Sequence, residues 1–122
     1  MKSRDALIRL KRFDVEEKRR KVADIEAMIG DFNHMAVDLD RQIAIEQERA
    51  GITDVNHYAY PTFAKAAIQR RNNLTASASD LAAKLAAARG DLDEASDELK
   101  KIELLEERDA ERREVGASVH LE

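Results

Sequence analysis

Cysteine and tryptophan are absent from this sequence of 122 residues, which contains one proline and four glycines. Without cysteine the chain can form neither a disulfide framework nor a thiolate metal site, and its three isolated histidines provide no helical pair of metal ligands. No run of about 18 apolar residues predicts a membrane span, and no charged-then-apolar segment predicts secretion. We therefore expect a cytoplasmic protein that holds no metal or cofactor and does not insert directly into a membrane.

Sequence motifs of catalysis are missing as well. The chain has no glycine-rich phosphate loop and no dinucleotide-binding fingerprint. His57 follows Asp54 closely, but no serine, cysteine or second carboxylate is predictably held beside it, so it is a poor candidate for a general base. We therefore expect no catalytic residues and no enzymatic activity.

The residues that are abundant favour long helices. Charged residues make up 38% of the chain and aromatic residues 4%. Alanine supplies 20 of the apolar residues, so a thick globular core is not expected, because alanine buries little apolar surface. Heavy use of Ala, Glu, Lys, Leu and Arg with few helix breakers is typical of a coiled coil when the apolar residues recur with helical period.

A seven-residue repeat of apolar residues runs through both halves of the chain. It predicts one helix from about Ser3 to Ala50 and a second from Pro61 to about Arg113, with residues 114–122 forming a frayed tail. Gly51 is a good helix stop, Asp54 can cap a turn, and Pro61 suits the first helical position. The predicted coiled-coil seam consists of Ile8, Val15, Val22, Ile25, Ile29, Phe32, Leu39, Ile43, Leu74, Leu81, Leu85, Leu92, Leu99 and Ile102.

The sign of the charge alternates along the chain and predicts how the two helices pair. Residues 1–21 carry nine basic and four acidic side chains, residues 22–49 two and seven, residues 62–90 five and one, and residues 91–122 five and twelve. Antiparallel pairing sets unlike charges side by side, whereas parallel pairing opposes like charges. We therefore predict an all-α fold, a long antiparallel two-helix coiled-coil hairpin.

The charged residues of the seam suggest the register of this hairpin. The favoured register places Lys11 beside Glu106 and Glu46 beside Arg71, and a register one heptad away remains open. Outer positions rich in methionine and alanine leave room for two hairpins to associate into a bundle, so a homodimer is a further possibility.

Five apolar residues lie off the seam near the open end of the hairpin. Leu7, Leu10 and Phe13 belong to the first helix, and Leu104 and Leu105 to the second. Such a cluster, flanked by Arg12 and other basic residues, is typical of a partner-binding surface. The alternative is a ragged end in which these residues pack on one another, with the basic run around Lys18 forming an ordinary solvated face.

Three of the five aromatic residues, Tyr58, Tyr60 and Phe63, lie in the connector or just after it. Tyr58 and Tyr60 are candidates for a second partner-binding site, because an exposed tyrosine makes a good anchor. The alternative is a small hydrophobic plug that covers the first turn of the second helix.

Several segments together resemble the FliJ family of flagellar type III export proteins, above all its alphaproteobacterial branch. They are residues 7–13 (LIRLKRF), residues 16–20 (EEKRR), the connector residues 58–67 (YAYPTFAKAA) and residues 106–109 (EERD). The resemblance implies a cytoplasmic hairpin similar to the stalk of rotary ATPases, peripherally associated with the flagellar basal body. It also implies two partners, the hexameric flagellar export ATPase, bound through the open end, and a membrane protein of the export gate.

Two other functions stay open at this stage. One is an export chaperone that escorts exported flagellar subunits or works with their chaperones, and the other is a plain dimerising scaffold. Nucleic acid is not an expected partner, because the acidic helix suppresses binding through the basic start of the chain. A remnant of cloning is one interpretation of the final Leu121-Glu122, and the sequence leaves it open.

Overall fold

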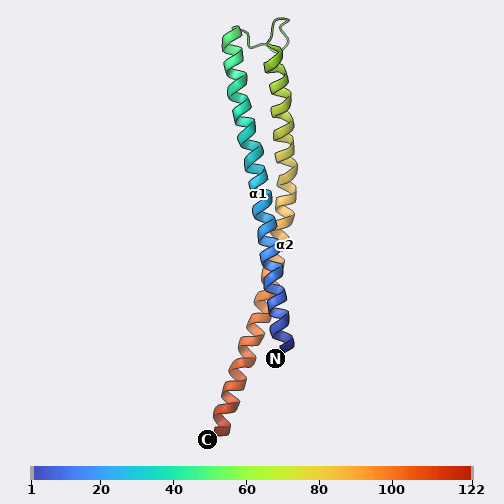
Figure 1. Ribbon diagram of the computed structural model, residues 1–122. Coiled ribbons are helices and arrows are strands. Elements are labelled where there is room, and N and C mark those ends of the chain that lie inside the picture. Colours follow the sequence, from blue (N-terminus) through green and yellow to red (C-terminus); the bar gives the residue numbers. More distant parts are fainter. Residues whose placement is uncertain (1, 122) are drawn as a thin grey trace. The chain divides into compact units, whose positions relative to one another are not determined.

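The computed structural model describes residues 2–121, and the side chains of residues 3–117. It contains two helices, α1 (Lys2–Ala50, 49 residues) and α2 (Thr62–Leu121, 60 residues), and no strand among the described residues (Figure 1). The helices pack against each other in opposite directions, since ion pairs join Arg4 to Glu106 and, further along α1, Lys11 to Glu98. The predicted all-α antiparallel hairpin is confirmed.

The chain forms two compact units. The terminal unit comprises Met1–Val22 and Ala87–Glu122, and the connector unit comprises Ala23–Ala86. Each unit therefore contains a segment of α1 packed against a segment of α2, and each has its own stretch of the seam.

The seam of the terminal unit is formed by the predicted residues. Ile8, Val15 and Val22 of α1 are buried, and Leu92, Leu99 and Ile102 of α2 are half-buried. Ala88 and Ala95 are also buried. The small alanines fill the heptad positions between the larger α2 residues and leave space for the branched side chains of α1.

The connector unit continues the same pattern over a longer stretch of α2 than expected. The predicted seam residues of this unit are all buried or half-buried: Ile25, Ile29, Phe32, Leu39, Ile43, Leu74, Leu81 and Leu85. Ala64 and Ala67 are buried too, and Arg71 is half-buried. These three residues occupy seam positions and extend the heptad repeat of α2 back to its first turn. The sequence pattern did not predict this part of the seam, because none of the three is a large apolar residue.

Gly51 ends α1 as predicted. Its φ of +70° is a left-handed conformation that residues with a Cβ rarely adopt. The Gly51 N–H donates to the Glu48 carbonyl at 3.3 Å, and the Ile52 N–H donates to the Gln47 carbonyl at 3.3 Å. These two bonds form a Schellman motif, which satisfies carbonyl groups that the end of a helix leaves unpaired.

The connector is held by short-range hydrogen bonds. Asp54 caps a turn, as expected, because its Oδ1 accepts a bond from the Asn56 N–H at 2.9 Å. α2 begins at Thr62, one residue after the predicted start, and the Pro61 carbonyl accepts the Lys65 N–H at 3.1 Å. Pro61 thus precedes the first full turn, where its missing N–H costs no helical hydrogen bond.

The observed register differs from the favoured one. Glu106 pairs with Arg4 instead of Lys11, and Arg71 pairs with Asp40 instead of Glu46, so the register is the one about a heptad away. Arg4 and Lys11 both occupy seam positions, so charge pairing is satisfied in either register. In the observed register, Tyr60 of the connector is buried and accepts a hydrogen bond from Gln47 of α1 at 2.8 Å.

The prediction that the second helix gives way to a frayed tail near Arg113 is not what the structure shows. α2 continues to Leu121 and extends past the first residues of α1 within the terminal unit (Figure 1). The heptad repeat reports contact with a partner helix, not helicity itself, so its loss did not mark the helix end. The interpretation of the last two residues as a cloning remnant includes Glu122, which lies outside the described residues.

Replacing glycines by alanine should change stability in opposite directions at different positions. An added Cβ meets no atom within 4 Å at Gly30 or Gly90, so each helical substitution should raise the free energy of unfolding by about 1 kcal/mol. Gly51→Ala should lower it by about 1 kcal/mol, because alanine is strained at positive φ. Urea unfolding followed by circular dichroism measures all three. A stabilised Gly51→Ala variant would contradict the assigned helix end.

Candidate partner-binding surface

Three large apolar residues of α1 are exposed in the terminal unit. Leu7, Leu10 and Phe13 follow one another at intervals of three residues, which places them on one face of the helix. Phe13 is 63% exposed and Leu10 is 62% exposed. Their heptad positions lie outside the seam, so the packing of α1 on α2 leaves their side chains uncovered.

α2 adds two apolar residues at the same level. Leu104 and Leu105 are exposed and belong to the terminal unit. Leu7 and Leu105 both occupy position g, and in an antiparallel pair the two g positions lie on the same side of the seam. The observed register sets residue 7 beside residues 103–105, because Arg4 pairs with Glu106. We call the set Leu7, Leu10, Phe13, Leu104 and Leu105 the terminal surface.

The predicted basic residue of this surface is engaged with α2. Arg12 Nη2 donates to Glu103 Oε2 at 2.9 Å, and the neighbouring Lys11 Nζ donates to Glu98 Oε2 at 2.9 Å. Both pairs join α1 to α2 at the level of the terminal surface. Arg12 therefore helps to align the two helices, and its charged group lies next to the apolar residues of the terminal surface.

The basic run on α1 is largely neutralised within the helix itself. Lys18 binds Asp14 at 2.6 Å, Arg20 binds Glu17 at 2.7 Å, and Arg19 binds Glu16. Such exposed pairs contribute little to stability, because water and salt screen them. This arrangement fits the alternative reading of the run as a solvated face.

An ion-pair network holds the start of α1 to α2. Arg4 donates to the carboxylates of Asp109 and Glu106, and Arg113 donates to Glu106 at 2.8 Å. The hydrogen bond to Asp109 raises the pKa of Arg4, and the same bond lowers the pKa of Asp109. The pKa of Glu106 is lowered chiefly by its hydrogen bond from Arg113.

The seam of the terminal unit contains one further polar residue, Lys18, bordered by two open hollows. The larger has a volume of about 320 Å³ and is lined by Glu17, Lys18, Lys21, Ala88 and Asp91. The hydrogen bond with Asp14, supported by the charges of Asp91 and Glu98, raises the pKa of Lys18. The hollows form because the residues of α2 opposite Lys18 are small alanines. The charged end of Lys18 makes their lining polar.

The connector residues behave differently from one another. Tyr58 is 96% exposed and stacks on His57 with ring centroids 4.7 Å apart. The His57 ring is oriented by the Ala59 N–H, which donates to its Nδ1 at 3.0 Å. Tyr58 is thus an exposed aromatic side chain on an ordered turn.

Tyr60 does not form part of an exposed contact site. Its side chain is 7% exposed, and its hydroxyl accepts the hydrogen bond from Gln47. A ring buried in this way fits the hydrophobic plug that was the alternative for the connector. The assignment of Tyr60 to a partner-binding site is therefore corrected, because its apolar surface and its hydroxyl are already used within the connector unit.

No family model matches this chain, and no curated protein or solved structure is significantly similar to it. Over its described residues, neither helix is long and apolar enough to cross a membrane. In the same part of the chain, no three His, Asp or Glu side chains are grouped so that they could hold a metal ion.

Acidification should weaken the attachment of α1 to α2 through Asp109. Its pKa is lowered from the ordinary value of 3.8, so the ion pair stabilises the fold above that value and is lost as the pH falls through the lowered pKa. Arg4→Gln should therefore make the loss of stability below about pH 5 shallower than in the native protein. Urea midpoints measured over a pH series test this.

The matched control for this experiment is Arg19→Gln. Arg19 is exposed, and its one ion pair with the described part of the chain is with Glu16, three residues earlier on the same helix. The pH dependence of this variant should follow that of the native protein. Equal slopes for Arg4→Gln and the native protein would show that the pair with Asp109 does not stabilise the fold.

Proposed function

We propose that this protein is a coiled-coil component of a flagellar type III export apparatus, and that it binds the hexameric export ATPase as a stalk. The proposal rests on the resemblance of residues 7–13, 16–20, 58–67 and 106–109 to the FliJ family. The structural observation that supports it is the terminal surface. No catalytic chemistry is assigned to the chain in this proposal.

The terminal surface has the composition of a protein-binding site. Its exposed leucines and phenylalanine lie off the seam, so the packing of α1 on α2 leaves a large part of each side chain uncovered. Large apolar side chains exposed at one level of a helix pair gain free energy when a partner covers them. The hexameric ring of the export ATPase is the partner that the resemblance implies for this surface.

In the proposed mechanism the hairpin transmits force and makes or breaks no bond. The terminal surface contacts the ring unequally, so that nucleotide turnover in its subunits is biased. The pairs Arg12–Glu103 and Arg4–Asp109 tie both helices together at this level, so that a push on one helix is shared by the other. Contact with the cytoplasmic part of the export gate then couples the ATPase to transport.

The experiment that tests the proposal measures ATP hydrolysis by the cognate export ATPase with and without this protein. We expect the native protein to stimulate hydrolysis, and Leu10→Asp combined with Phe13→Asp to weaken the apparent affinity at least about tenfold, because two apolar contacts are lost. Val37→Asp is the matched control. Val37 is also an exposed apolar residue of α1, but it belongs to the connector unit.

The folded state of each variant is checked by its helical circular dichroism. Full stimulation by a folded Leu10→Asp, Phe13→Asp variant would overturn the role of the terminal surface. If the native protein neither stimulates hydrolysis nor binds the ATPase, the stalk proposal fails. A pull-down with exported filament-type subunits then distinguishes an escort chaperone, which binds them, from a plain scaffold, which does not.

A further inference from the structure

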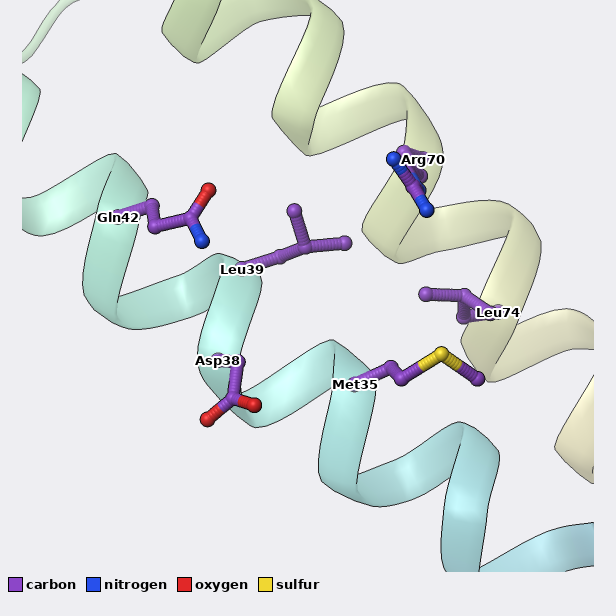
Figure 2. Close-up of a pocket in the computed structure, with 6 residues that line it drawn as sticks. All are labelled: Met35, Asp38, Leu39, Gln42, Arg70 and Leu74. Atoms are coloured by element: carbon purple, nitrogen blue, oxygen red, sulfur yellow. The ribbon is translucent and has the colours of Figure 1, made fainter.

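A shallow groove runs along one side of the connector unit. It contains two hollows of about 190 and 150 Å³, which share Leu39, Gln42 and Arg70. Figure 2 shows the first hollow, with Met35 extending from α1 toward Leu74 of α2. We call this feature the connector groove.

The connector groove is bordered mainly by apolar side chains. The half-buried seam residues Leu39 and Leu74 form its floor. Met35 of α1 and Phe63 of α2 line its walls. Met28, Met35 and Phe63 are exposed and occupy position g, the heptad position that faces this side of the seam. The seam is therefore incompletely covered on this side.

On the opposite side of the connector unit, an ion pair crosses from α2 to α1. Arg71 lies across the seam and binds Asp40 at 3.0 Å. This pair covers part of the seam on this side. The difference between the two sides indicates that the connector groove is the face available to another helix pair.

The charges along the connector groove have opposite signs on its two walls. On α1, Asp24, Asp31 and Asp38 occupy position c, and on α2, Arg70 and Lys84 occupy position g. Among the described residues, Arg70 and Lys84 make no hydrogen bond or ion pair. One face thus carries an acidic wall, in which Asp38 also pairs with Arg41 of its own helix at 3.3 Å, and a basic wall, so it is complementary to a copy of itself.

We propose that the connector groove binds the connector groove of a second copy of this chain, forming a two-fold symmetric four-helix bundle. The acidic α1 of each copy lies over the basic α2 of the other. The opposite two-fold arrangement would set α1 against α1 and α2 against α2, opposing like charges. In the favoured arrangement Asp38 approaches Arg70 of the second copy, because both residues line the same hollow. Asp24 then approaches Lys84, because Asp24 is as far from Asp38 along α1 as Lys84 is from Arg70 along the antiparallel α2.

The first test is the oligomeric state in sedimentation equilibrium, at protein concentrations up to about 200 µM. The native protein should dimerise, and Met35→Glu should weaken the dimer at least about a hundredfold, because the methionines of both copies lose their contacts. Val37→Glu is the matched control, since Val37 is 46% exposed and Met35 39%, and Val37 lies two residues further along α1 outside the hollow. Its dimerisation should match that of the native protein.

The second test examines the arrangement of the helices by exchanging charges. Asp38→Arg and Arg70→Asp should each weaken self-association about tenfold, because each creates like charges at two symmetric positions. A mixture of these two variants should form a mixed dimer with affinity near that of the native protein. Mass spectrometry of an isotope-labelled mixture identifies it.

A native protein that stays monomeric up to the highest concentration would overturn the proposal. So would a dimer that Val37→Glu weakens as much as Met35→Glu, or a mixture of charge variants that forms no mixed dimer. If the groove instead binds a helix of another protein, the native chain will be monomeric alone. These measurements use no ATPase, so their outcome is independent of the stalk proposal.

Discussion

The contact between α1 and α2 along their heptad seams is the interaction on which the rest of the structure depends. Within residues 2–121 neither helix has another helix or strand to pack against, so each seam residue stabilises both helices at once. Half of the buried apolar residues in the described chain are alanines, which bury little surface and allow the helices to approach closely. Stability therefore rests on many small contributions, and ion pairs such as Arg12–Glu103 act mainly by fixing alignment.

This dependence explains why the fold could be predicted. A heptad repeat predicts which side of each helix packs against the other helix. Ile8, Val15 and Leu92 occupy the seam as expected. The alternating charge gave the direction, because only antiparallel pairing joins unlike charges. Gly51 marked the end of α1, since a left-handed residue there favours glycine.

The register and part of the candidate site were not predictable in the same way. Cations recur at Arg4, Lys11 and Lys18, so the position of Glu106 was ambiguous by one heptad. The choice depends on the connector, where the burial of Tyr60 requires a three-dimensional turn that no periodic pattern encodes. The exposed residues of the terminal surface were identifiable, because a residue off the seam in a two-helix hairpin has nothing else to cover it.

The segment of α2 that extends past the start of α1 has a consequence for how this chain tolerates changes in length. Inserting one residue inside the paired region rotates every later side chain by about 100° around the helix axis and moves the seam away from its partner. Among the described side chains, Asp109 makes the last pair with α1, through Arg4, so an insertion or deletion beyond it displaces none of their seam contacts. The length of the unpaired end of α2 can thus change without disturbing the hairpin. The paired region, in contrast, can be lengthened or shortened only by whole heptads.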